Sequence, residues 1–217
     1  MKNGVVLFIG IFLTLAFSWG ILLFLNATHP AYGQLGPHVD EMTNAYRPSP
    51  TLGWAEGGRA VYQSLGCAAC HTQQVRRPDF GSDFERGWGN RQSVSRDYIG
   101  HERVFLGSMR IGPDLRNVGD RELPEEWSHL TWEQYHHVHL YDPRLTVGGS
   151  LMPSFAYLYE KRPVVGEVSA KALPLNVEEG YEIVPTRRAE ELVAYLRSLS
   201  LDYELPESVP VSPTVTE

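Results

Sequence analysis

The sequence predicts a mainly α-helical protein, in which a single membrane-spanning helix at the N-terminus is followed by a helical domain with long loops. Three observations support this fold class. There is an apolar run near the N-terminus, and there are two amphipathic segments with a helical period, at residues 53–66 and 186–199. Between these segments lies a long stretch with mostly irregular spacing. The 217 residues suffice for one domain, an anchor and long loops.

The apolar run extends from Gly4 to Leu25 and contains no charged residue. As a helix it would span roughly 33 Å, which is enough to cross the ~30 Å hydrocarbon core of a bilayer. A cleaved signal peptide has an apolar core of only about 7–15 residues and a small-x-small cleavage site. Residues 26–30 read Asn-Ala-Thr-His-Pro and provide no such site. We therefore expect an uncleaved transmembrane anchor at residues 1–26.

Small residues recur on one face of this anchor. Gly10, Thr14 and Ser18 are spaced four residues apart and therefore share a face. Such a face lets a second transmembrane helix approach closely. Small residues are also common in any such helix, so the sequence leaves open whether this face docks on a partner.

Residues 27–52 have the composition of an extended linker. The segment contains two glycines and the prolines Pro30, Pro37, Pro48 and Pro50. Such a linker would hold the following domain near the membrane without a core of its own.

The rest of the chain is organised around a Cys-x-x-Cys-His motif, formed by Cys67, Cys70 and His71. This is the pattern for covalent attachment of a c-type haem, because two thiols reach the two vinyl groups while the adjacent imidazole ligates the iron. These cysteines are the only two, which fixes one haem c and leaves none for a disulfide or an iron–sulfur cluster. A redox-active cysteine pair is the alternative, but it needs a βαβ context that the sequence does not suggest.

A short amphipathic helix precedes the motif and ends at Gly66. Its apolar positions are Val61, Tyr62 and Leu65. Its Gly57-Gly58 pair permits close contact with another helix. The candidate partner is the helix at 186–199, which Thr186 can cap. The apolar face of that second helix carries Leu192, Tyr195, Leu196 and Leu199.

Two further landmarks lie between these helices. Residues 112–115 read Gly-Pro-Asp-Leu and resemble a landmark of cytochrome c domains. The resemblance implies that the Pro113 carbonyl accepts a hydrogen bond from the ring of His71. The alternative is a simple turn with proline at its second position.

A helix is also expected from Thr131, as its cap, to Tyr141, ending near Pro143. Three histidines, His136, His137 and His139, lie close together in it. No carboxylate or cysteine is placed to complete a metal site, so we interpret them as surface or haem-flanking residues.

The iron needs a sixth ligand, and methionine is the usual choice in electron carriers. Met42 lies in the linker, and Met109 adjoins the Gly-Pro-Asp-Leu turn on the proximal side. Met152 follows a helix and a loop and precedes proline, which is the arrangement that cytochrome c domains use for the distal ligand. We therefore predict that Met152 is the sixth ligand.

These features predict a class I cytochrome c-like haem domain at residues 53–201. Residues 202–217 contain three prolines and are expected to form a disordered tail.

The net charge of −7 gives no uniformly basic face for nucleic acid. It is compatible with a basic redox partner or with ordinary solubility.

Taken together, the motifs resemble the membrane-anchored monohaem cytochrome c subunit (subunit II) of cbb(3)-type cytochrome c oxidases. The resemblance rests on Gly58-Arg59, Tyr62, Gly66-Cys67, Cys70-His71-Thr72-Gln73, Val75-Arg76, Arg110, Gly112-Pro113-Asp114-Leu115, Val118-Gly119, Arg121, Trp127, His139-Leu140, Asp142-Pro143-Arg144 and Met152-Pro153. The chain departs from the family pattern at residues 76–80, which read Arg-Arg-Pro-Asp-Phe, and in the unusual segment 159–185.

The resemblance implies an electron-transfer subunit of a terminal oxidase. Such a subunit takes electrons from a donor cytochrome c, either a further cytochrome c subunit or a soluble one. It passes them to the haem b and haem–copper centre of a separate catalytic subunit, where oxygen is reduced, so this chain holds no oxygen-reducing site. The alternative is a free-standing membrane-tethered monohaem cytochrome c that shuttles electrons between other respiratory complexes.

The same motifs suggest a location. In bacteria, c-type haem is attached on the outer side of the cytoplasmic membrane. We therefore expect a single-pass protein of the cytoplasmic membrane, with a cytoplasmic N-terminus and a periplasmic haem domain. The positive-inside rule adds little, because Lys2 is the only cation on the short side of the helix.

Three arginines are candidates for neutralising haem propionates or a partner's carboxylates: Arg76, Arg77 and Arg144.

Overall fold

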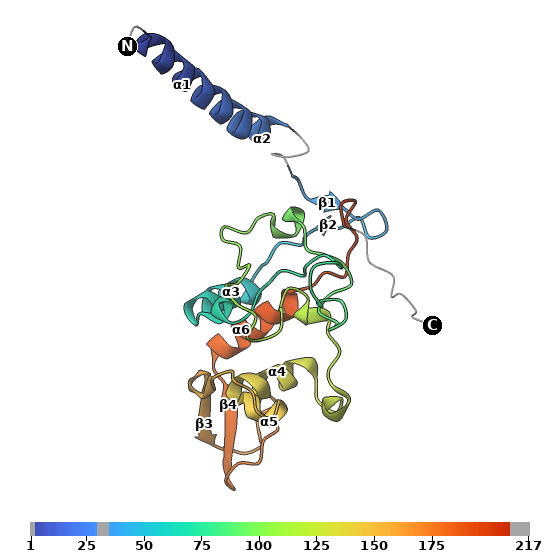
Figure 1. The fold of residues 1–217 in the computed structure, drawn as a ribbon. Helices are drawn as coiled ribbons and strands as arrows, with labels where there is room; N and C mark the ends of the chain where they lie inside the picture. The colour runs from blue at the N-terminus through green and yellow to red at the C-terminus, as the bar shows by residue number, and fades with distance from the viewer. Residues whose placement is uncertain (1–2, 30–34, 209–217) are drawn as a thin grey trace. The chain divides into compact units, whose positions relative to one another are not determined.

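The computed structural model describes residues 3–29 and 35–208 (Figure 1). Its contacts divide the chain into two compact units. The first comprises Met1–Pro48 and Val94–His101, and the second comprises Ser49–Ser93 and Glu102–Glu217.

The first unit begins with the expected apolar helix. It runs through α1 (Gly4–Trp19), a π-helical turn η1 (Gly20–Leu25) and α2 (Asn26–Thr28). The continuous helix Gly4–Thr28 has a mean hydropathy of 2.5 in its most apolar window, and none of that window is buried within the chain. By length and composition this helix can cross a membrane.

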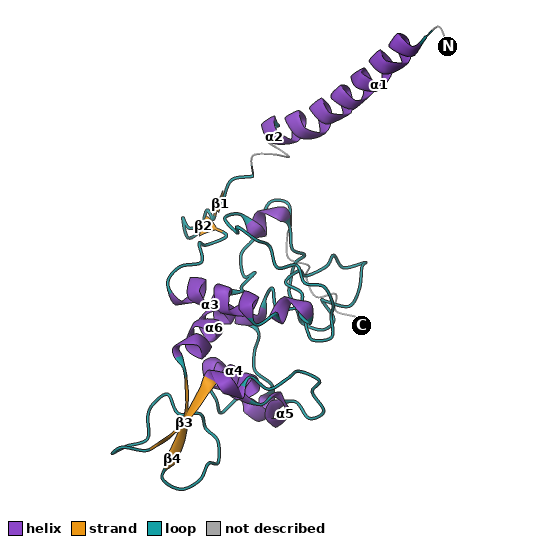
Figure 2. Ribbon diagram, turned by 90° about the vertical axis from the view of Figure 1, so that its left-hand side faces the viewer, coloured by secondary structure: helices purple, strands orange, loops and turns teal. Residues whose placement is uncertain are grey.

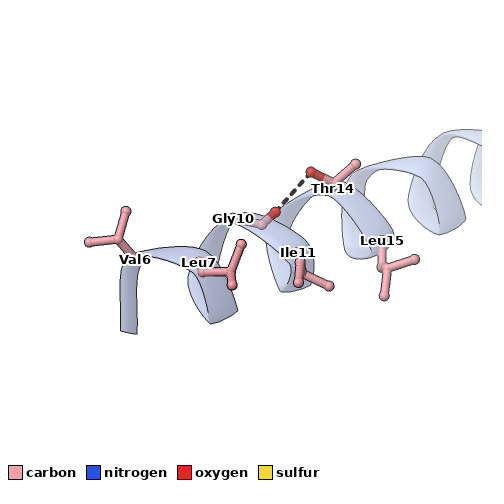
Figure 3. A pocket seen from close by; sticks show the side chains of 6 residues that line it. All are labelled: Val6, Leu7, Gly10, Ile11, Thr14 and Leu15. Atoms are coloured by element: carbon pink, nitrogen blue, oxygen red, sulfur yellow. Dashed lines mark hydrogen bonds between the residues drawn. The ribbon is translucent and has the colours of Figure 1, made fainter. Parts of the chain in front are cut away.

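Figure 3 shows a shallow groove on this helix. The groove is lined by Val6, Leu7, Gly10, Ile11, Thr14 and Leu15. The Thr14 hydroxyl donates a hydrogen bond to the Gly10 carbonyl at 2.8 Å, so its polarity is satisfied within the helix. Ser18 shares the face by spacing but does not line the groove.

The expected linker contains a short hairpin. Strands β1 (His38–Val39) and β2 (Tyr46–Arg47) pair antiparallel. The Asp40 carboxylate stabilises the connecting turn by accepting from the main-chain nitrogens of Met42 and Thr43, at 2.9 and 3.1 Å. The segment therefore has more local structure than an extended linker.

The second unit is built on two helices that lie side by side in both views, α3 (Trp54–Ser64) and α6 (Arg187–Ser198) (Figures 1 and 2). A Cβ added at Gly58 would overlap the main-chain carbonyl of Glu191, so only glycine allows this approach. The rings of Tyr62 and Tyr195 meet edge to face, 5.4 Å apart. The predicted close helix pair is confirmed.

The predicted helix caps are confirmed only in part. Thr131 caps α4 (Trp132–Tyr141), accepting from the Gln134 nitrogen at 3.1 Å. Thr186 precedes α6 but makes no capping bond, because its hydroxyl donates to the Leu158 carbonyl at 2.8 Å. Pro143 opens a further helix, α5 (Pro143–Thr146), instead of only ending the one before it.

The segment 159–185 forms a second hairpin. Strands β3 (Tyr159–Pro163) and β4 (Tyr181–Pro185) pair antiparallel, with Tyr159 opposite Pro185. Short 3₁₀ turns complete the fold: η2 (Cys67–Ala69), η3 (Ser95–Tyr98), η4 (Val118–Asp120), η5 (Glu125–Trp127) and η6 (Ala156–Leu158). The fold is mainly α, as predicted.

We expected a disordered tail at residues 202–217, but the first part of this segment packs against the domain. Tyr203 and Leu205 are buried, and the buried Arg91 donates to the Tyr203 carbonyl at 2.8 Å. Alternate apolar residues therefore extend the packed domain to residue 208. Residues 209–217 lie outside the described residues.

Candidate functional site

The Cys-x-x-Cys-His motif begins where α3 ends. Gly66 adopts a left-handed conformation, with φ 71°, which turns the chain out of the helix. The motif then forms the 3₁₀ turn η2, in which His71 N donates to the Cys67 carbonyl at 3.0 Å. Both cysteines are free and half-buried, and burial raises the pKa of the Cys67 thiol to about 11.

The imidazole of His71 is held in one orientation. Its Nδ1 lies 2.8 Å from the Pro113 carbonyl oxygen, and because a carbonyl can only accept, Nδ1 carries the proton. The unprotonated Nε2 is then available as a metal ligand. The ring lies directly against Gly112, where an added Cβ would overlap it. Burial lowers the pKa of His71, opposed by the hydrogen bond to Pro113, so the neutral ring is favoured.

The methionines differ sharply in burial. Met42 is 96% exposed and Met109 is 51% exposed, whereas Met152 is half-buried and packs against the hydrophobic core. Cys67 packs against the same core cluster. The burial pattern therefore singles out Met152 among the three methionines that the structure describes.

The three histidines of α4 are half-buried, and each ring has its own partner. His136 Nδ1 bonds to the Trp132 carbonyl, His137 Nδ1 to the Tyr159 hydroxyl and His139 Nδ1 to the Thr146 hydroxyl. Burial lowers the pKa of each ring to about 4. They are therefore only partly exposed, and within residues 3–29 and 35–208 they belong to no metal-binding group.

The three arginines that are candidates for neutralising haem propionates or a partner's carboxylates also have contacts within the chain. Arg76 pairs with Asp83 at 2.7 Å, and Arg144 lies 3.6 Å from Asp142. The guanidinium of Arg77 lies over the ring of Phe80 at 5.9 Å.

Arg121 is a residue of the site that was not predicted from the sequence. Its Nη2 donates to the Asp114 main-chain carbonyl, next to Pro113, and its charge contributes to the lowered pKa of His71. Burial lowers the pKa of Arg121 to about 10. Its Nε is buried and has no hydrogen-bond partner in the described part of the chain, and the same holds for the Trp127 indole nitrogen. Both residues belong to the motifs that carry the family resemblance, but their spacing assigns neither of them a role at the site.

These groups suit a haem. The motif offers two thiols and an imidazole with a free Nε2, and Met152 offers a half-buried thioether. Arg121 Nε and the Trp127 indole nitrogen are buried donors with no acceptor among the described residues, and the two carboxylates of a haem are acceptors. The residues present therefore fit the group that the motif implies.

A model of a known protein family matches this chain. The family described as "Cytochrome C oxidase, mono-heme subunit/FixO" matches residues 37–191, which is more than half of the 217 residues. The matched range begins before the hairpin β1–β2 and includes the haem motif, Pro113 and Met152. A search of curated proteins finds no match.

Proposed function

The chain belongs to the family of mono-haem subunits of cytochrome c oxidase, and from this premise we propose that it is the electron-transfer subunit of a membrane-bound haem–copper oxidase. It receives electrons from a donor cytochrome c, either a further subunit or a soluble protein. It delivers them to the catalytic subunit, where oxygen is reduced.

The observation that carries this proposal is the 2.8 Å hydrogen bond from His71 to the Pro113 carbonyl. It places the proton on Nδ1, which leaves Nε2 unprotonated, and it holds the ring in one orientation. A hydrogen-bond acceptor at the ring nitrogen that does not bind the metal raises the basicity of a ligating imidazole.

The chain's residues have distinct roles in holding the haem. Cys67 and Cys70 would bind it covalently through thioether bonds, and His71 and Met152 would ligate its iron. Arg121 offers its Nε to a haem carboxylate. The haem supplies a centre that gains and loses one electron. With both His71 and Met152 as ligands, the iron would have no open position, which would restrict it to electron transfer.

The experiment is an assay of oxygen uptake with reduced cytochrome c, in membranes that contain no other oxidase. We expect a His71→Gly variant to lose nearly all cyanide-sensitive uptake. His38→Gln, which changes a histidine of the other compact unit, is the matched control and should retain it. Unchanged uptake in the His71 variant would refute the relay and favour the free-standing shuttle.

The helix Gly4–Thr28 is proposed to anchor the chain in the cytoplasmic membrane, with its N-terminus in the cytoplasm and the haem domain in the periplasm. The groove at Gly10 and Thr14 gives this helix a face that fits a transmembrane helix of the catalytic subunit (Figure 3).

A double variant, Gly10→Leu with Thr14→Leu, should release the chain from the purified complex without changing its haem content. Val5→Leu with Leu13→Val alters only residues outside the groove and is the control. Normal co-purification of the groove variant would show that the anchor only tethers.

A further inference from the structure

Two segments meet at the candidate haem site, one that follows the haem motif and one that carries Pro113. Main-chain hydrogen bonds join them on both sides of the Pro113 carbonyl. Gly112 N donates to the Cys70 carbonyl at 3.1 Å, and Leu115 N donates to the Thr72 carbonyl at 2.8 Å. The position of the Pro113 carbonyl is therefore set by how firmly these segments are joined.

A single carboxylate provides the side-chain part of this junction. Asp114 directly follows Pro113 and is fully buried. Its Oδ2 accepts from the Thr72 hydroxyl at 2.5 Å and from Gln74 N at 2.7 Å, and its Oδ1 accepts from Arg116 N at 2.8 Å. Thr72 is the residue that directly follows the proximal histidine. The two neighbours of the His71–Pro113 hydrogen bond are thus bonded to each other.

Arg110 balances the buried charge and extends the junction. Its guanidinium lies 3.6 Å from Asp114 Oδ2, donates to the Gln74 carbonyl at 2.6 Å and pairs with Asp83 at 2.6 Å. The Asp83 side chain is buried and also accepts from Arg76 N at 2.8 Å. Removing Asp114 would leave buried donors without acceptors, which destabilises such a junction.

From this geometry we propose that Asp114 is a positioning residue for the haem iron. Its hydrogen bond to Thr72 holds the Pro113 carbonyl against His71 Nδ1 and thereby sets the strength of that hydrogen bond. A strong bond to Nδ1 increases electron donation by the imidazole and favours ferric iron. Loosening the junction therefore raises the reduction potential. The inference rests on the proposed ligation of the haem by His71.

The test uses the full-length, haem-loaded protein in detergent and a pair of variants at Thr72. Thr72→Val keeps the shape of the side chain but removes the hydroxyl donor, whereas Thr72→Ser keeps the donor. Two quantities are measured: the rate at which the His71 Nδ1 proton exchanges with deuterium, followed by NMR, and the midpoint potential. In Thr72→Val, we expect the His71 Nδ1 proton to exchange about five- to tenfold faster, because the loss of one hydrogen bond has an effect of this size. We also expect a more positive midpoint potential. Thr72→Ser should match the wild-type protein.

Asp114→Asn should have the same effects, and larger ones, because it loses the charge as well. Glu122→Gln removes an exposed carboxylate and controls for charge alone, so its exchange rate should be unchanged. If Thr72→Val leaves both quantities at wild-type values, or speeds exchange equally at all core amides, the junction is only structural and the inference is overturned. A wild-type protein with no haem-shifted His71 signal would overturn the haem site itself, and this inference with it.

Discussion

The two sides of the candidate haem site are held in different ways. On the proximal side, the His71–Pro113 hydrogen bond is flanked by the buried Asp114 carboxylate and its three donors. On the distal side, Met152 N donates a local hydrogen bond to the Ser150 hydroxyl, at 3.3 Å, and the neighbouring Leu151 is 83% exposed. The proposed proximal ligand, His71, is positioned by polar contacts, and the proposed distal ligand, Met152, by packing against the core.

This difference suggests how the site responds to the haem. The protein fixes the proximal imidazole through its own hydrogen bonds, so that side needs no iron to be ordered. The segment around Met152 has fewer tertiary hydrogen bonds and gains more order from a bond to iron. We therefore expect changes on the proximal side to disturb the whole site, and changes on the distal side to have confined effects.

The largest expected effect tests attachment at the proximal side. In a Cys67→Ala, Cys70→Ala double variant, no thiol remains to form a thioether. Acidified organic solvent should then extract any remaining haem completely, whereas the wild-type protein should retain its haem. Either single variant should keep at most one thioether. Extraction of haem from the wild-type protein would contradict covalent attachment.

The next effect is confined to the distal side. Met152→Ala should abolish the weak near-infrared sulfur-to-iron charge-transfer band and let carbon monoxide bind ferrous iron, because the sixth position opens. The proximal ligand should be retained, since its hydrogen bonds are untouched. Met109→Ala changes an exposed methionine and is the control. Loss of the band in the control, with retention in the Met152 variant, would reverse the assignment.

A pair of glycines compares the two sides directly. A Cβ at Gly112 would overlap the His71 ring, whereas at Gly148, in the distal loop, it would meet no atom within 4 Å. Gly112→Ala should therefore lower the free energy of unfolding by about 1–3 kcal/mol and reduce haem content. Gly148→Ala should change it by less than about 1 kcal/mol, in either direction. Equal effects, measured by urea unfolding, would remove the distinction between the sides.

The helices could be predicted from the sequence because each buries one periodic apolar face. The contact at Gly58 follows from the same pattern, since a glycine pair on that face permits a close approach. The proximal hydrogen bond of His71 was expected from the Gly-Pro-Asp-Leu landmark. The helices follow from periodic patterns within single segments, whereas the His71–Pro113 hydrogen bond joins residues 42 apart and was expected only from the resemblance to a family.

The remaining features depend on contacts between distant loops, which leave no local period. The partners Thr72 and Asp114 are 42 residues apart, and the Arg91–Tyr203 contact joins residues 112 apart. Strand β3 was missed because four of its five residues are exposed, so it lacks the alternation of a half-buried strand. Burial of Tyr203 likewise depends on a distant arginine.

The smallest expected effect concerns pH and the helix α4. Burial lowers the pKa of His137 to about 4, against a usual value of 6.5, although Glu190 and Glu133 favour its charged form. The unfolded chain therefore binds a proton between these pH values that the folded chain does not, so stability is lost as pH falls from about 6.5 towards 4.

Between pH 7 and pH 5, His137 should lower the free energy of unfolding by at most about 2 kcal/mol. A His137→Gln variant removes the titrating group, and the remaining Tyr159 hydroxyl can still find a polar partner in the amide. Its loss of stability between pH 7 and pH 5, followed by urea unfolding, should be smaller than that of the wild-type protein. His129→Gln changes an exposed histidine and should reproduce the wild-type pH dependence. An identical pH dependence in the wild-type protein and the His137 variant would mean that this ring titrates normally, and that α4 opens enough to hydrate it.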